Sequence, residues 1–132
     1  MMMKVLIVED EALTAMAMEE VLVDHGYEVV AIADDQVSAM KAAEVHSPDF
    51  AFVDINLAGG DSGILLAAQF KPLGIVVVFA TGTCPGDEFN DVALGCIHKP
   101  TSKISLVSAA RFVEASISSL PLPRPPQGMH LY

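Results

Sequence analysis

The feature that most constrains the fold is a series of short apolar runs, each followed by polar or charged residues. Phe50-Ala51-Phe52-Val53 is the most informative run, because it is too short for a helix and delivers Asp54 at its carboxyl end. Unbroken apolar residues indicate a strand that is buried on both faces. The composition agrees, since 52% of the residues are hydrophobic and only 18% are charged. We therefore expect a sheet that is covered by helices on both sides.

Segments with helical character separate the apolar runs. The predicted strands are residues 4–8, 27–33, 50–53, 75–80 and 95–98, and the predicted helices are residues 12–25, 35–45, 64–70, 84–94 and 102–120. The helix at 84–94 contains Pro85, Gly86 and Asn90, so we expect it to be short or irregular. Five strands that alternate with five helices predict an α/β fold with an open, doubly wound parallel sheet.

The chain is expected to form one domain over residues 1–120, followed by a tail over residues 121–132. The tail contains Pro121, Pro123, Pro125 and Pro126, and we expect it to be extended and disordered. Docking of the tail into an aromatic-lined groove is the alternative.

Charge and cysteine usage exclude several functions. The net charge of −10 argues against nucleic acid and anionic lipid as partners, and no apolar run is long enough to span a membrane. We expect a cytoplasmic protein, because the amino end lacks the pattern of a secretory signal. Cys84 and Cys96 are too few for a zinc site or a disulfide framework, and both are expected to be reduced packing residues.

Polar residues follow four of the predicted strands at their carboxyl ends, where ligands bind in sheets of this kind. They are Glu9 and Asp10, Asp54, Thr81, and Lys99. Clustered carboxylates suit Mg²⁺. Asp54 can then attack a phosphoryl donor, while Lys99 pairs with the phosphate and Thr81 hydrogen-bonds to it.

In its order of motifs, the chain resembles a response-regulator receiver domain of bacterial two-component signalling. The resemblance covers residues 4–120, through Val8-Glu9-Asp10-Glu11, Val53-Asp54, the glycine-containing turn at 59–63, Ala80-Thr81-Gly82 and Lys99-Pro100. It implies a flavodoxin-like fold with the strand order 2-1-3-4-5. It also implies a cis peptide bond before Pro100.

The resemblance implies a function as well. Asp54 would accept a phosphoryl group from a histidine kinase or a histidine phosphotransfer protein, in a phosphorelay that requires Mg²⁺. The metal would be held by Asp10, Asp54, the backbone carbonyl of Asn56 and, directly or through water, Glu9. Such a chain promotes only its own phosphorylation and dephosphorylation, so it is not an enzyme in the ordinary sense.

Two features set the chain apart within this family. Phe79-Ala80-Thr81-Gly82 partly resembles the "FAT GUY" subgroup, which consists of single-domain regulators linked to general stress responses. Cys96 stands where many receivers carry a switch aromatic, three residues before Lys99. We therefore expect phosphorylation to order or shift the segment from Gly82 to Leu94.

The leading hypothesis is a single-domain response regulator that signals by contact with a downstream protein. The sequence leaves open whether the chain forms a homodimer. A phosphohydrolase with an aspartyl nucleophile is disfavoured, because Asn56 stands where the general acid of that class belongs. The remaining alternative is a receiver-like interaction module that works without phosphorylation.

Other residues are expected to be structural. His98 should point away from Lys99 on its strand. Met16, Met18 and Met40 are expected to fill the core. The apolar face of the first helix is expected to contain Leu13, Met16, Ala17 and Val21.

Overall fold

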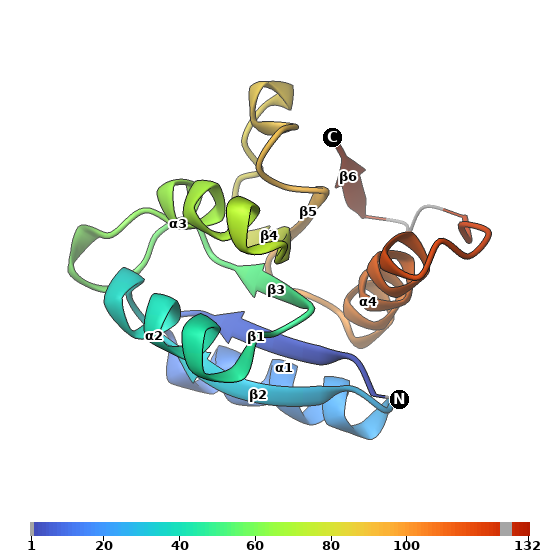
Figure 1. The fold of residues 1–132 in the computed structure, drawn as a ribbon, viewed down its shortest axis with the longest axis horizontal. Coiled ribbons are helices and arrows are strands. Elements are labelled where there is room, and N and C mark those ends of the chain that lie inside the picture. Colours follow the sequence, from blue (N-terminus) through green and yellow to red (C-terminus); the bar gives the residue numbers. More distant parts are fainter. Residues whose placement is uncertain (1, 125–127) are drawn as a thin grey trace.

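The computed structural model describes residues 2–124 and 128–132. Its centre is a sheet in the order β2-β1-β3-β4-β5-β6, in which the first five strands are parallel (Figure 1). The strands are β1 (Lys4–Val8), β2 (Glu28–Ala33), β3 (Phe50–Val53), β4 (Val76–Thr81), β5 (Gly95–His98) and β6 (Met129–Leu131). The predicted strand order 2-1-3-4-5 is confirmed.

Within the described residues, four α-helices flank the sheet: α1 (Ala12–Asp24), α2 (Gln36–His46), α3 (Gly63–Phe70) and α4 (Lys103–Ile117). Single 3-10 turns occur at Ala58–Gly60, Lys71–Leu73 and Asp87–Phe89. The last of these is all that forms where the sequence predicts a short or irregular fourth helix. Pro85 and Gly86 precede this turn, and both residue types are unfavourable in a helix interior.

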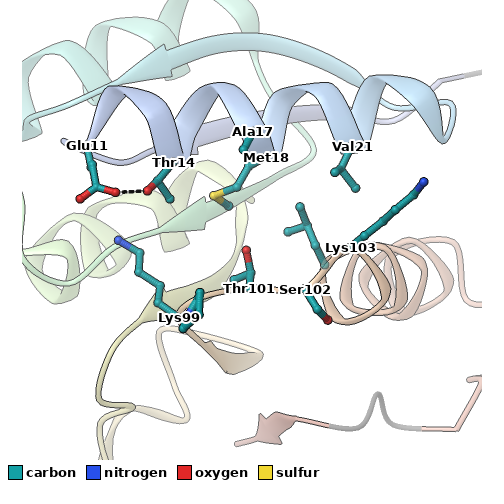
Figure 2. A pocket seen from close by; sticks show the side chains of 11 residues that line it. Glu11, Thr14, Ala17, Met18, Val21, Lys99, Thr101, Ser102 and Lys103 are labelled. Carbon is teal, nitrogen blue, oxygen red and sulfur yellow. Dashed lines mark hydrogen bonds between the residues drawn. The ribbon is translucent and has the colours of Figure 1, made fainter.

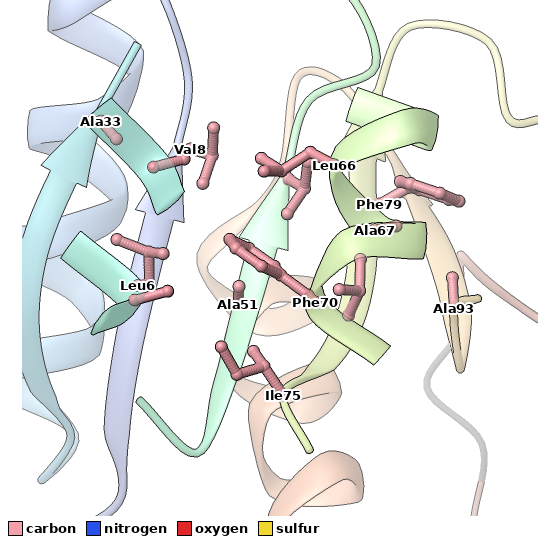
Figure 3. Packing of buried hydrophobic residues seen from close by; sticks show 14 of the residues in the cluster. Leu6, Val8, Ala33, Ala51, Leu66, Ala67, Phe70, Ile75, Phe79 and Ala93 are labelled. Carbon is pink, nitrogen blue, oxygen red and sulfur yellow. The ribbon is translucent and has the colours of Figure 1, made fainter. Parts of the chain in front are cut away.

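Two apolar cores lie on opposite faces of the sheet because successive residues of each strand point to opposite sides. Leu6 and Val8 of β1 pack on the side of α2 and α3, together with Phe70 and Phe79 (Figure 3). Val5 and Ile7 belong to the other core, which α1 and α4 cover. This division explains why the strands are apolar at nearly every position.

The face that α1 buries differs from the predicted one. Its buried residues are Ala15, Met18 and Leu22, whereas Leu13 is 79% exposed and Met16 is 59% exposed. Most residues of α1 are apolar, so hydrophobicity alone does not select the buried face. The prediction that Met16 fills the core is therefore wrong, while Met18 is buried as predicted.

The tail contributes a strand that the sequence did not predict. Met129–Leu131 pair antiparallel with β5, so that Gly95 lies opposite Leu131. The expectation of a disordered tail is wrong for these residues. Gly95 makes the pairing possible, because a Cβ atom there would lie 2.7 Å from the backbone oxygen of His130. Pro125 and Pro126 lie outside the described residues.

Candidate phosphoacceptor site

The candidate site lies at the carboxyl ends of β1, β3, β4 and β5. Strand register fixes its backbone, since Asp54 N donates to Val8 O at 2.9 Å and Lys99 N donates to Thr81 O at 2.9 Å. Glu9, Asp54 and Thr81 are only 3%, 7% and 3% exposed. Short strands that end in register thus bring together residues from four separate parts of the sequence.

Lys99 is the cation at the centre of this arrangement. Its Nζ donates to Asp54 Oδ2 at 2.7 Å and forms an ion pair with Glu9 Oε1. Burial disfavours the charge of the ammonium, but the hydrogen bonds to Asp54 and Glu9 outweigh burial and raise the pKa of Lys99. The two acids therefore keep Lys99 in its positively charged form.

Glu9 is the most buried acid of the site. Burial raises the pKa of its carboxyl, and the contact with Lys99 and the bond from Glu11 N at 3.1 Å oppose that rise. Across the site, Asn56 N donates to Asp54 Oδ1 at 3.3 Å. Both buried carboxylates are thus oriented by a backbone amide as well as by Lys99.

Glu9, Asp10 and Asp54 each offer a carboxylate oxygen, and these oxygen atoms lie within 4.8 Å of one another. Hard oxygen donors at such spacing fit Mg²⁺, which typically takes one or two carboxylates and keeps several waters. Asp10 is exposed, so one side of the cluster is open to water and to a donor molecule. Asn56, the remaining predicted metal ligand, follows β3 beside Asp54.

Gly63 is a supporting residue whose role the sequence did not reveal. It begins α3, and a Cβ atom at this position would lie 2.0 Å from the backbone oxygen of Asp54. Only glycine permits this approach. The sequence shows a glycine-containing turn at residues 59–63, but only the structure shows the contact with Asp54.

The two cysteines form a disulfide bond, with Cα atoms 5.9 Å apart. The prediction that both are reduced is wrong. The loop after β4 folds back over β5, where it brings Cys84 to Cys96. Spacing along the sequence gave no sign of this, because the loop that closes the distance has no regular periodicity.

A groove of about 390 Å³ runs between α1 and α4 and has Lys99 at one end (Figure 2). Its walls include Ala17, Met18 and Val21 of α1 and Leu106 of α4. Glu11 and Thr14 hydrogen-bond at the same end as Lys99. An apolar channel therefore leads along the helices to the candidate site.

Comparison with known families identifies the fold and the site. The family model of the response regulator receiver domain matches residues 5–111. The chain belongs to this family. Receiver domains typically bind Mg²⁺ and interact with histidine kinases or phosphotransfer proteins. The predicted cis peptide bond between Lys99 and Pro100 is also present.

Relatives of this receiver domain include two named regulators. The transcriptional regulatory protein PdtaR of Mycobacterium tuberculosis is 29% identical over 119 residues, which are 87% of this chain and 57% of PdtaR. The chemotaxis protein CheY of Bacillus subtilis is 36% identical over 70 residues, which are 53% of this chain and 58% of CheY. The chain thus spans little more than half the length of these relatives.

Solved structures agree. The receiver domain of a modulated diguanylate cyclase from Desulfovibrio desulfuricans has a TM-score of 0.79 and 27% identity, over 90% of this receiver and 98% of that chain. A CheY-like receiver from Methanospirillum hungatei has a TM-score of 0.82 over 90% of this receiver and 98% of that chain, and at 22% identity it shows the fold alone. In the described part of this receiver, no helix has both the length and the apolar character needed to cross a membrane.

Proposed function

We propose that Asp54 accepts a phosphoryl group from a phosphohistidine of a histidine kinase or histidine phosphotransfer protein. The observation that carries the proposal is the Asp54 carboxylate, which is held 2.7 Å from Lys99 Nζ and close to the oxygens of Glu9 and Asp10. An isolated surface acid would need none of these partners.

The transfer makes one bond and breaks one bond. A carboxylate oxygen of Asp54 attacks phosphorus, the bond from phosphorus to the histidine nitrogen breaks, and the imidazole leaves. Lys99 then shifts from the carboxylate to the negative charge on the phosphoryl oxygens, and the Thr81 hydroxyl donates to one of them. Asp10, Asp54, the backbone carbonyl of Asn56 and Glu9 would hold Mg²⁺, which would supply further charge neutralisation when bound.

The exposed apolar residues of α1 suit the docking of the donor. Leu13 and Met16 are largely exposed, and α1 also forms one wall of the groove that leads to Lys99. A donor helix seated there would bring its phosphohistidine to the open side of the site. We further propose that the chain acts in the cytoplasm, where phosphoryl donors made from ATP are available, and that it signals by contact with a downstream protein.

Acetyl phosphate tests the proposal directly. With Mg²⁺ present, intact mass should show one phosphate adduct on the wild type and none on Asp54→Asn, which keeps the side-chain shape. Glu44→Gln, an acid on α2 outside the site, serves as the matched control and should form the adduct normally. A folded wild type that takes up no phosphate, or an adduct that survives in Asp54→Asn, would reject Asp54 as the acceptor and favour a phosphorylation-independent module.

A further inference from the structure

The segment between β4 and β5 is held in place by a disulfide and by the tail rather than by a helix. Cys84 lies three residues after Thr81, and Cys96 lies three residues before Lys99. The bond therefore joins the two chain segments that deliver Thr81 and Lys99 to the candidate site. Residues 82–94 themselves contain one 3-10 turn, whose bonds include Asn90 N to Asp87 O at 3.1 Å.

The tail makes three further attachments to the same segment. His130 Nε2 lies 2.7 Å from Asp87 Oδ1, the Tyr132 hydroxyl donates to Pro85 O at 2.9 Å, and Tyr132 N donates to Leu94 O at 3.1 Å. The Tyr132 ring also packs edge-on against Phe79, at a centroid distance of 6.5 Å. Together, the Cys84–Cys96 disulfide and the contacts of His130 and Tyr132 form a clamp on residues 82–94. In the described chain the disulfide is its only covalent part.

A reagent can reach the bond from one side. Cys96 is fully buried, but Cys84 is partly exposed and lines a pocket of about 310 Å³. The other walls of the pocket include Asp87, His98 and His130. The pocket thus gives a small thiol reagent a path to the partly exposed Cys84.

The disulfide is not needed to hold the fold together. Two apolar cores, one on each face of the sheet, already hold the domain together. Cys96 itself packs among Val77, Phe79 and Ala93 in one of them. Disulfides that form in a reducing compartment are usually transient and catalytic or redox-sensing.

We propose that Cys84 and Cys96 form a reversible redox site that a dithiol reductant, such as a thioredoxin-class protein, opens through the pocket at Cys84. A thiolate of the dithiol attacks Cys84 Sγ, the bond between the two sulfurs breaks, and Cys96 leaves as a thiolate that takes up a proton. The second thiol of the donor then closes the donor's own disulfide and releases Cys84, which is protonated in turn. Two electrons and two protons thus pass from the dithiol to the cysteine pair.

Reduction removes the covalent link and leaves residues 82–94 attached through the tail contacts, the hydrogen bond from Leu94 N to Val77 O and the packing of Ala93 in the core. Opening of this segment should become at least about tenfold more frequent, because covalent closure of a loop of this length changes such an equilibrium by more than a factor of ten. This coupling rests on the proposed function: if phosphorylation of Asp54 shifts this same segment, as the sequence predicts, the reduced chain should also accept phosphate faster.

The first test counts thiols in the folded chain. Wild type is equilibrated with graded ratios of reduced to oxidised dithiothreitol, alkylated with iodoacetamide and weighed intact, while circular dichroism monitors the fold. We expect no alkylation before reduction, two alkyl groups together on reduction of folded protein, and none after reoxidation. Two free thiols at the start, or thiols that appear only after unfolding in urea, would each overturn the redox site.

The second test follows the segment itself by hydrogen exchange. Amides of residues 82–94 should exchange at least about tenfold faster in reduced than in oxidised wild type, while those of β1 and β3 stay unchanged. Cys84→Ser, at the partly exposed position, should exchange like the reduced form under both conditions. Equal exchange in the two forms of the wild type would refute the clamp.

Phosphorylation provides a separate readout. Reduced wild type should form the acetyl phosphate adduct at least about threefold faster than oxidised wild type, and Cys84→Ser should match the reduced rate in either condition. Equal rates would refute the coupling to the site. Asp54→Asn should titrate with dithiothreitol as the wild type does, so a failure of the phosphoacceptor proposal and a failure of the redox site give different results.

Discussion

At the scale of single residues, Lys99 is the side chain on which the candidate site most depends. It is the cation that faces both Glu9 and Asp54, and these two acids are almost fully buried. Lys99→Met should lower the free energy of unfolding by about 2–3 kcal/mol without metal, because two buried carboxylates lose their counterion. Urea unfolding in the presence of EDTA measures this loss.

Mg²⁺ should return part of that loss if the acids form the metal site, since the cation replaces the missing ammonium. Lys71→Met, at an exposed lysine, is the matched control and should change stability by less than about 0.5 kcal/mol. A Lys99→Met chain as stable as the wild type would mean that the acids do not need a counterion.

Tyr27 is the residue with the clearest expected pH dependence. It is 2% exposed, and its hydroxyl donates to Glu114 Oε1 at 3.0 Å. Burial, followed by the hydrogen bond to Glu114, raises the pKa of the phenol above its ordinary value of about 10. Above that pH the unfolded chain releases the proton while the folded chain keeps it, so folding stability falls as pH rises.

Wild type should therefore lose up to about 1.4 kcal/mol of stability per pH unit above about pH 10 from this group. Tyr27→Phe should cost about 1 kcal/mol at pH 7, because it removes one hydrogen bond, and it should lack this alkaline loss. Urea unfolding of both chains between pH 8 and about pH 11.5 gives the difference directly. Parallel pH profiles would contradict the assignment to Tyr27.

At the scale of secondary structure elements, the start of α4 depends on a reciprocal cap. Ser105 N donates to Ser102 Oγ at 3.0 Å, and Ser102 N donates to Ser105 Oγ at 3.1 Å. Ser102→Ala should cost about 1 kcal/mol of unfolding free energy, whereas Ser116→Ala on the exposed side of the same helix should be nearly neutral. Equal effects in thermal unfolding would mean that the cap contributes nothing.

Strand β6 is the element with the strictest steric condition. A Cβ atom at position 95 would lie 2.6 Å from Met129 Cε and 2.7 Å from His130 O. Gly95→Ala should therefore cost about 1–3 kcal/mol, because the backbone of β6 must move. The same substitution in a chain truncated after Arg124 should lose most of that penalty, and the difference is a double-mutant cycle. Equal penalties in both chains would place the clash elsewhere.

Sequence patterns predicted some elements well and others poorly, for physical reasons. Strands β1 to β4 and helices α2 to α4 have clear signals, since apolar runs and caps such as Ser102 act over a few residues, whereas the run that forms β5 is a weaker signal. The buried face of α1, the strand β6 and the disulfide depend on contacts between distant residues. Cys84 and Cys96 in particular meet only because an irregular loop folds back over β5.

At the scale of the whole molecule, charge and metal effects must be separated. The formal net charge is −10, so any salt should stabilise the fold by screening self-repulsion. A site at Glu9, Asp10 and Asp54 predicts an additional Mg²⁺ effect of about 2.7 kcal/mol at a concentration 100 times its dissociation constant.

Melting curves in MgCl₂ and NaCl at equal ionic strength distinguish the two effects. Wild type should melt higher in MgCl₂, and Asp10→Asn should lose most of this difference. Glu20→Gln, an acid on α1 outside the cluster, should keep it. Identical melting temperatures in both salts would mean that salt acts by screening alone, and would contradict the proposed metal site.

The candidate site shows how far sequence reasoning reaches. Glu9, Asp54, Thr81 and Lys99 each follow an apolar strand, and parallel strands must end at one edge of the sheet, so their convergence is predictable. The pairing of Lys99 with both acids and the approach of Gly63 to Asp54 are not, since they depend on side-chain reach and on a backbone contact of a few ångströms. The resemblance to the FAT GUY subgroup stays a prediction.

The strand β6 also has a consequence for how copies of this chain behave toward one another. β6 pairs with the outer edge of β5. Without β6, backbone amides and carbonyls of β5 would face water, and such an uncovered edge strand is a template for aggregation. Exposed tails are the parts of proteins that proteases cut first. Proteolytic cleavage ahead of Met129 would therefore leave the five parallel strands in place but expose the edge of β5. The cleaved protein should then aggregate and precipitate before it unfolds.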